Sequence, residues 1–141
     1  MPYSTEFIDD GRGVIHIGEG VLTGAELIEG ALLVRAEIER HAVLEYGLTD
    51  LSGVGELSVT PEDLRRLADE HMVTARQLPN AVAAVIATSD HIYGMARMWE
   101  AYADPTRWTT RVFRDRASAE VWLREAVVAL RAEAARAGQS P

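Results

Sequence analysis

The side chains best suited to chemistry follow two predicted strands, at the point where each strand ends. One strand is expected over 44–51 and the other over 81–87, a continuous apolar run. Because neighbouring parallel strands end at one edge of a sheet, where α/β proteins usually bind ligands, we expect one polar pocket there. Its carboxylates, hydroxyls and imidazole are Asp50, Ser52, Thr88, Ser89, Asp90 and His91.

These groups include the parts of a Ser-His-Asp site, so an unassigned enzyme is one hypothesis. The chain lacks the Gly-x-Ser-x-Gly turn that exposes the nucleophile of many hydrolases. Asp90 is expected to cap the helix that follows, with Thr88 and Ser89 as ordinary strand-end hydroxyls. No motif commits the chain to a reaction, so the sequence favours a protein that is not an enzyme.

A helix predicted over 91–103 carries the other candidate binding groups. Arg97 could anchor a carboxylate or a partner residue, and the alternative is an ion pair within the helix, for example with Glu100. Tyr93 shares the face of Arg97, whereas Trp99 belongs to the apolar stripe. An apolar pocket near Trp99 and Tyr93 is therefore a second predicted site, with core packing as the alternative role of Trp99.

Two other patterns resemble ligand sites without the required spacing. The stretch 17–20 joins a strand to a helix, as phosphate loops do, but it is not Gly-x-Gly-x-x-Gly, and Glu19 would repel a phosphate. The four histidines come from different predicted elements, and no pair has metal-ligand spacing on one helix. We therefore expect no nucleotide, no metal and no other cofactor.

Composition narrows the classes further. The 141 residues contain no Cys, which excludes disulfides and thiol chemistry. The net charge of −8 disfavours a nucleic-acid partner. No stretch approaches the ~20 apolar residues of a membrane helix, and the first residues lack the pattern of a secretory signal. The sequence predicts a cytoplasmic protein with no integral membrane association.

Hydrophobic periodicity and turn residues predict a single α/β domain over 1–141 with the element order ββαβαβαβα. The sheet is expected to be five-stranded and mixed, with an antiparallel first hairpin closed by Asp10 and Gly11. A capping box at Thr23 begins the first helix, Thr60 caps the second with Pro61 at its first position, and Asp115 or Ser118 caps the last. Strands are predicted over 3–8, 14–17, 44–51, 81–87 and 108–114, helices over 23–41, 60–78, 91–103 and 115–138, and a frayed tail over 138–141.

The crossovers of this order have a geometric consequence. If each strand adds beside the previous one, right-handed crossovers place their helices on one face of the sheet. The opposite face would then lack a full helical cover, which suggests a homodimer or a ligand surface. The residues expected on that bare face are His16, Glu45, Gly47, Thr49, Ala83 and Val85.

At this point the chain resembles the SpoIIAA-like superfamily, which is related in fold to STAS domains and to the lipid-exchanging domain of SEC14/CRAL-TRIO proteins. The resemblance spans nearly the whole chain and implies a β-α superhelix, in agreement with the winding argued above. The motifs that carry it are Gly13-Val14-Ile15-His16-Ile17, Glu19-Gly20-Val21-Leu22-Thr23, Asp50-Leu51-Ser52-Gly53-Val54, Thr60-Pro61-Glu62-Asp63-Leu64, Ala84-Val85-Ile86-Ala87, Tyr93-Gly94-Met95-Ala96-Arg97-Met98 and Phe113-Arg114-Asp115 before Ala119 and Trp122-Leu123.

Two functions of these relatives are implied by the resemblance. STAS antagonists are switched by phosphorylation in an Asp-Ser-Ser-Gly-like turn before the second helix, which corresponds here to Ser58 or Thr60. The motif itself is absent, and the alternative role of Thr60 is a helix cap. SEC14-like lipid carriage implies a large apolar cavity and a gating helix, for which a chain of this length has little room.

The leading hypothesis is a non-enzymatic regulatory or protein-interaction module of STAS-like type, working as a homodimer. It would present the loops at 51–60 and 88–97 and the bare sheet face to a protein partner. The alternative is a binder of a small apolar or anionic ligand, using a pocket near the segment 88–99. The third hypothesis is the unassigned enzyme.

Overall fold

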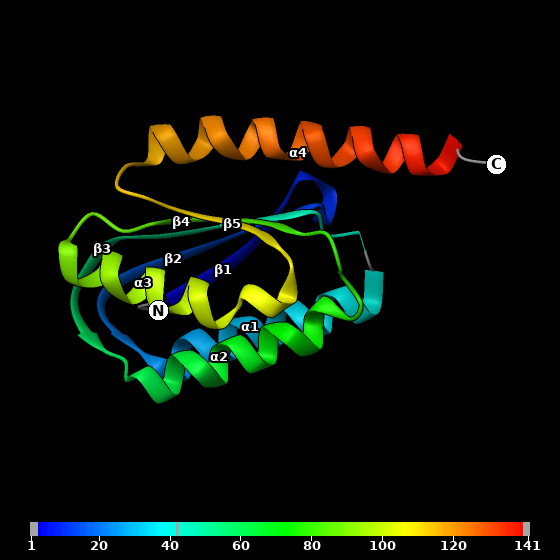
Figure 1. Ribbon diagram of the computed structural model, residues 1–141. Coiled ribbons are helices and arrows are strands. Elements are labelled where there is room, and N and C mark those ends of the chain that lie inside the picture. The colour runs from blue at the N-terminus through cyan, green and yellow to red at the C-terminus, as the bar shows by residue number, and fades with distance from the viewer. Residues whose placement is uncertain (1–2, 42, 140–141) are drawn as a thin grey trace.

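A mixed five-stranded sheet organises the chain, seen in a computed structural model that describes residues 3–41 and 43–139 (Figure 1). The strands lie in chain order, β1 and β2 are antiparallel, and every later pair is parallel. The predicted order ββαβαβαβα and the predicted mixed sheet are confirmed. The elements are β1 (Tyr3–Ile8), β2 (Gly13–Thr23), α1 (Gly24–His41), β3 (Tyr46–Ser58), α2 (Pro61–Ala75), β4 (Val82–Ile86), α3 (Asp90–Tyr102), β5 (Thr109–Phe113), α4 (Arg116–Gln139) and two short 3-10 turns, η1 (Asp9–Gly11) and η2 (Asp104–Thr106).

The second and third strands are longer than the sequence predicts. Because β2 continues to Thr23 and β3 to Ser58, the glycine-rich stretch 17–20 and most of the predicted loop 51–60 form a parallel pair. The register of that pair shifts at two irregularities, and Gly20 has a φ of 65° there. Such bulges interrupt the apolar alternation from which strands are predicted, which explains the two early boundaries.

Polar side chains at the helix starts fix where three of the helices begin. Thr23 and Glu26 form the predicted capping box, and the predicted cap Thr60 forms a further one with Asp63. At α3 the prediction is wrong by one residue, because the hydroxyl of Ser89, and not the Asp90 carboxylate, accepts the N–H of Ile92 at 3.3 Å.

The start of α4 follows the prediction and its end does not. The Asp115 carboxylate accepts the N–H of Ser118 at 2.8 Å, which confirms one of the two predicted caps. The helix then passes Gly138 and ends at Gln139. The predicted tail beyond it, 140–141, lies outside the described residues.

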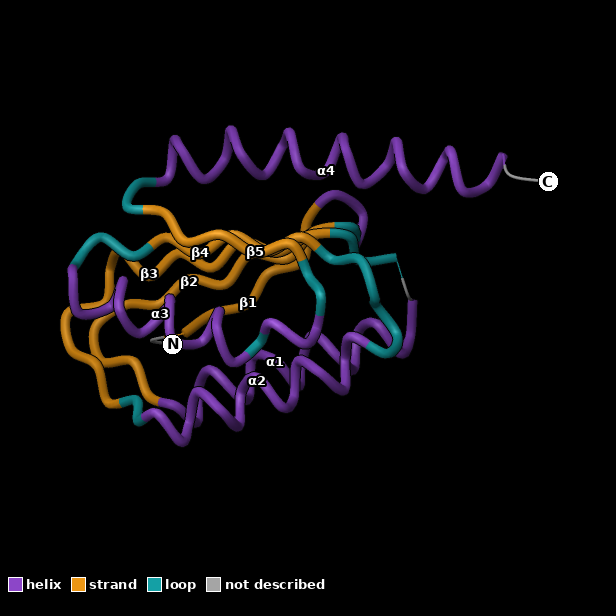
Figure 2. Tube along the Cα trace, in the orientation of Figure 1, coloured by secondary structure: helices purple, strands orange, loops and turns teal. Residues whose placement is uncertain are grey.

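The helices divide unequally between the two faces of the sheet. Figures 1 and 2 show α1, α2 and α3 together on one face and α4 alone on the other. The first three are right-handed crossovers between neighbouring parallel strands, which places them on one side. Because α4 follows the last strand and returns to no further strand, this rule does not fix its face.

The prediction that one face of the sheet lacks helical cover is therefore wrong, since α4 covers much of that face. The apolar stripe of α4 packs on alternate residues of the inner strands, and a second core forms there. Its buried members are Leu48, Val82, Ala84, Ile86, Ala119, Leu123 and Val127.

The assignment of strand residues to the two faces is reversed for most of the residues expected on the bare face. Alternation shows which residues share a side but not which side it is. The more apolar set lies under the single helix α4, and the mixed set lies under three helices. His16, Gly47, Thr49, Ala83 and Val85 face the three-helix layer, and Glu45 lies on the α4 side.

One ion pair fastens the far half of α4. The Arg131 guanidinium donates to the Glu45 carboxylate at 2.8 Å and lies 3.6 Å from Asp9 of η1. Beyond this contact the helix passes the end of the sheet, and residues 132–138 are exposed (Figure 1). No helix in the described part of the chain has the length and apolar character needed to cross a membrane.

Candidate functional site

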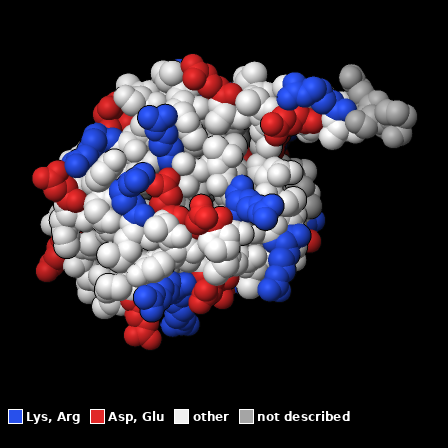
Figure 3. All heavy atoms as spheres, viewed as in Figure 1, with Lys and Arg blue, Asp and Glu red and all other residues white. Residues whose placement is uncertain are grey.

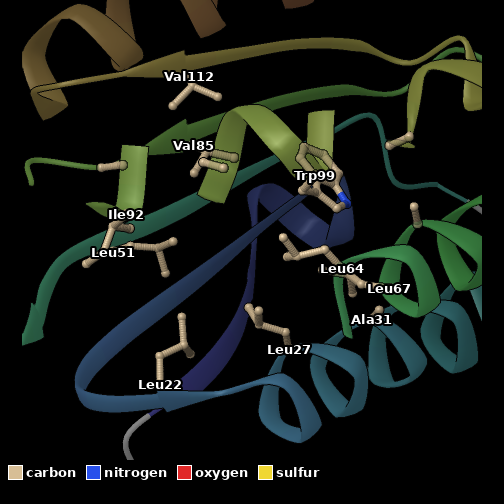
Figure 4. Packing of buried hydrophobic residues seen from close by; sticks show 14 of the residues in the cluster. Leu22, Leu27, Ala31, Leu51, Leu64, Leu67, Val85, Ile92, Trp99 and Val112 are labelled. Carbon is tan, nitrogen blue, oxygen red and sulfur yellow. The ribbon is translucent and has the colours of Figure 1, made fainter. Parts of the chain in front are cut away.

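A cavity of about 130 Å³ lies between the sheet and the layer of α1, α2 and α3. We call it the sheet–helix cavity. Figure 4 shows part of its wall, with Trp99 of α3 on one side and Leu64 and Leu67 of α2 on the other. Its apolar lining includes Val14, Leu27, Ala31, Val34, Ile38, Leu51, Val85, Met95, Ala96 and Trp108, and its polar lining includes Tyr3, His16, Thr49, His71 and Thr74.

Small residues on the central strands leave this space open. Gly47 and Thr49 of β3 and Ala83 of β4 line the cavity, where larger side chains would fill it. A side chain at Gly47 would also crowd its neighbour on β2, because a Cβ at this position would lie 3.3 Å from Cγ1 of Val14. None of these three residues is fully buried, which is expected of side chains that border an open space.

His71 of α2 is held in one tautomer by its contact with α3. The indole Nε1 of Trp99 donates to His71 Nδ1 at 3.1 Å, and the ring of Trp108 lies 5.3 Å from the imidazole. Because an indole nitrogen can only donate, Nδ1 carries no proton and Nε2 carries it. Burial, and secondarily the charges of His16 and Arg35, lower the pKa of His71 to about 3. His71 is therefore neutral at pH 7.

His16 of β2 is the second imidazole of the cavity wall. Its ring stacks on Tyr3 with centroids 5.3 Å apart, and the Thr5 hydroxyl lies 2.8 Å from its Nδ1. Burial lowers the pKa of His16 to about 4. Burial also raises the pKa of Tyr3, against the opposing effect of a hydrogen bond with Thr49. The side chains of His71, His16 and Tyr3 are thus uncharged at neutral pH.

The charges closest to the cavity are already paired. Behind Thr74, the Arg35 guanidinium lies 3.2 Å from the Glu70 carboxylate and donates to the Thr74 hydroxyl at 3.1 Å. No Asp, Glu or Arg is among the described residues that line the cavity. Apart from the buried Asp50, the charged side chains of the described residues are partly or fully exposed, and both signs are interspersed on the face shown in Figure 3. The cavity is therefore an uncharged site with a few polar groups.

The predicted polar pocket at the strand ends is divided between two arginines. Asp50 is buried on the α4 side, where its carboxylate accepts from the Ser52 hydroxyl at 2.6 Å and from Arg116 at 3.3 Å. The exposed Asp90 binds Arg114 instead, at 2.8 Å.

The remaining strand-end groups do not assemble into the geometry of a hydrolase. Arg114 also donates to the Thr88 carbonyl at 3.3 Å, and Ser89 is committed to capping α3. His91 is exposed, and no hydrogen bond within the described residues joins it to Asp50 or Asp90. This arrangement does not support the Ser-His-Asp hypothesis.

The candidate residues of α3 have separate environments. Arg97 forms the alternative ion pair with Glu100, at 2.9 Å. Tyr93 lies under the Arg114 guanidinium, 4.1 Å from its ring centroid, whereas Trp99 lines the sheet–helix cavity. A pocket near Trp99 thus exists, but its wall does not include Tyr93 among the described residues.

The two residues considered for phosphorylation differ in their roles. Ser58 is exposed at the end of β3. The Thr60 hydroxyl accepts the N–H of Asp63 at 3.1 Å, as expected for the cap of α2. The phosphoswitch remains a prediction.

The sequence placed His16 and Thr49 on a face expected to serve a homodimer or a ligand, but no polar group of the cavity wall was chosen as a site residue, although a signal was present. His71 lies seven positions after Leu64, which places it on the buried stripe of α2. His16 likewise lies two positions after Val14, so both side chains share the inner side of β2. A histidine on a buried face could have been chosen on this ground. Tyr3 and Thr49 carried no such signal.

No group of His, Asp and Glu in residues 3–41 and 43–139 could hold a metal ion. No protein-family model matches the chain, and no curated protein matches it. A solved structure is similar over 86% of this chain and 91% of its own, with a TM-score of 0.53 and 19% sequence identity. That protein is an uncharacterized member of the DUF3478 family, with a SpoIIAA-like fold, from Shewanella loihica PV-4. The chain therefore has the SpoIIAA-like fold that its sequence motifs predicted.

Proposed function

We propose that this chain binds a small, mostly apolar molecule in the sheet–helix cavity. The observation that carries the proposal is the cavity itself, with its volume of about 130 Å³ and its largely apolar wall. An engineered cavity of roughly 150 Å³ in another protein binds benzene, so this volume has room for one ring. It has no room for a lipid with two acyl chains.

The hypothesis of a protein-interaction module has less support. It depended on a bare sheet face and on a loop at 51–60, but α4 covers much of that face and β3 extends to Ser58. Residues 88–97 are the part of the proposed docking surface that stays outside the sheet, with His91 and Arg97 exposed. Self-association as a homodimer remains a prediction.

The three tryptophans supply a direct test of the binding site. Trp99 and Trp108 line the cavity, whereas Trp122 packs against Phe113 on the α4 side of the sheet. Titration with toluene, followed by the three indole N–H resonances in a nitrogen-15 correlation spectrum, should shift the first two signals and leave that of Trp122 unchanged.

A matched pair of variants locates the site further. Ala83→Leu fills the cavity from the sheet and should abolish the toluene response. Val121→Leu adds apolar bulk at an exposed position of α4 and should leave the response unchanged. A toluene response that persists in folded Ala83→Leu protein, or a uniform response of all three indoles, would overturn the proposed site. Native mass spectrometry of the purified chain would show a ligand carried from the cell.

A further inference from the structure

We propose that the ligand is an uncharged single-ring molecule carrying one hydroxyl or carbonyl oxygen, and that His71 binds this oxygen through its Nε2–H. The inference rests on the proposed function and names the class of molecule that the same cavity takes. It is carried by three properties of the wall, namely its size, its lack of charge and the placement of its hydrogen-bonding groups.

Lack of charge excludes ionised ligands. An ion that enters a site without a counter-charge loses its hydration with nothing in exchange. The described lining residues carry no charged side chain, and the nearby guanidinium of Arg35 is engaged by Glu70 and Thr74. The anionic ligand considered from the sequence therefore fits this cavity poorly.

Hydrogen bonding favours an oxygen on the ring. His71 has its Nδ1 engaged by Trp99, and no hydrogen bond within the described residues engages its Nε2. His16 is arranged in the same way, with Nδ1 beside Thr5 and no such bond at Nε2. A wholly apolar ligand would cover these polar atoms without satisfying them, which costs free energy.

The geometry of His71 makes it the donor of the site. The Trp99 indole can only donate, so it keeps Nδ1 of His71 unprotonated and the proton on Nε2. The Nε2–H group lies on the side of the imidazole ring away from Nδ1 and is available as a donor. An acceptor oxygen on the ligand completes the pair. The aromatic rings of Trp99 and Trp108, both lining residues, supply apolar surface for the ring itself.

Three probes of similar size separate these properties at pH 7, namely toluene, p-cresol and benzoate. A hydroxyl weakens entry into a purely apolar site, so a Kd for p-cresol equal to or lower than that for toluene indicates that the oxygen is bound. Benzoate, which is ionised, should give no shift of the Trp99 and Trp108 indole signals at the same concentration. Benzoate binding as tight as that of p-cresol would overturn the inference.

Two substitutions assign the contact to His71. His71→Phe should raise the Kd for p-cresol by about tenfold and change that for toluene by less than about twofold. His71→Gln keeps an N–H donor and should retain part of the preference for p-cresol. Circular dichroism identifies which variants are folded, and the comparison of probes in the unaltered chain needs no variant.

The outcomes separate the two proposals. Toluene binding that Ala83→Leu abolishes, without any advantage for p-cresol, would retain the proposed function and reject this inference. Equal losses for both probes in folded His71→Phe protein would also reject it. No response to any probe would reject both.

Discussion

Trp99 donates its indole N–H to Nδ1 of His71 at 3.1 Å, and this hydrogen bond joins α3 to α2 across the edge of the sheet–helix cavity. Trp99 is buried and His71 is half-buried, so the contact is partly shielded from water. It positions the one imidazole of the cavity whose tautomer is determined by its neighbour.

Replacing the Trp99 indole should destabilise the chain by more than the loss of buried apolar area alone would predict. Trp99→Phe deletes the indole and leaves His71 Nδ1 without a partner, at a cost of about 1–3 kcal/mol in addition to the lost packing. Urea unfolding measures the change in the free energy of unfolding. Trp122→Phe is the matched control, because no hydrogen bond within the described residues engages that indole, and an equal loss in both variants would contradict the prediction.

Stability should fall in mild acid because two half-buried histidines resist protonation. The unfolded chain takes up protons near the ordinary pKa of 6.5, whereas the folded chain does so only near 4 at His16 and near 3 at His71. Between pH 6.5 and 4 the unfolded state therefore binds more protons, and the free energy of unfolding decreases as the pH falls. The groups that act on His71 are His16 and Arg35, and neither supplies a counter-charge to an imidazolium.

The control for this pH dependence is present in the same chain. His71→Gln should reduce the loss of stability between pH 6.5 and 4, with the contribution of His16 remaining, and urea unfolding at several pH values measures it. His91→Gln changes an exposed histidine and should leave the slope as it is. A slope that is the same in the unaltered chain and in both variants would show that His71 titrates normally.

Arg131 should control the local opening of α4 more than global stability. The residue binds Glu45 through three donor–acceptor contacts and also approaches Asp9, but its side chain is about half exposed, so water screens the pair and its contribution to global stability is small. Arg131→Ala should speed hydrogen exchange over the last two turns of α4. Arg124→Ala, at another exposed position of the helix, should not, and equal exchange in both variants would exclude the anchoring role.

Thr60 and Ser58 should differ in their effect on stability, because only the Thr60 hydroxyl caps α2. Thr60→Ala removes the acceptor for the Asp63 N–H and should lower the free energy of unfolding by about 1 kcal/mol. Ser58→Ala should change the free energy of unfolding by much less than Thr60→Ala does, since Ser58 is exposed. Thermal unfolding of both variants tests this. Equal stabilities would show that the cap contributes little and would leave Thr60 free for another role.

The fold was predictable from the sequence because local signals agreed with each other. Apolar runs, the Asp-Gly turn and the helix caps at Thr23 and Thr60 each indicated an element, and right-handed crossovers then predicted the side of three helices. The same rules could not place α4, which no following strand constrains. They also could not show which side of β3 faces inward, so Thr49 and Gly47 were assigned to the wrong layer.

The site was less predictable because it depends on what several elements leave unfilled. Each residue of the cavity wall has an ordinary local role, such as a strand alanine at Ala83 or a helix histidine at His71. Only their packing against one another produces a space with two neutral imidazoles at its edge. In contrast, the reactive groups at the strand ends are held by Arg114 and Arg116, whose pairing partners the sequence did not indicate.

The sheet–helix cavity should also make the folded state sensitive to hydrostatic pressure. Pressure favours unfolding because the total volume decreases, and that decrease scales with the internal void volume that unfolding eliminates. A hollow of about 130 Å³ beside the main core should therefore lower the pressure at which the chain unfolds. A molecule that occupies the hollow would raise that pressure, so the midpoint of pressure unfolding reports occupancy without any knowledge of the occupant.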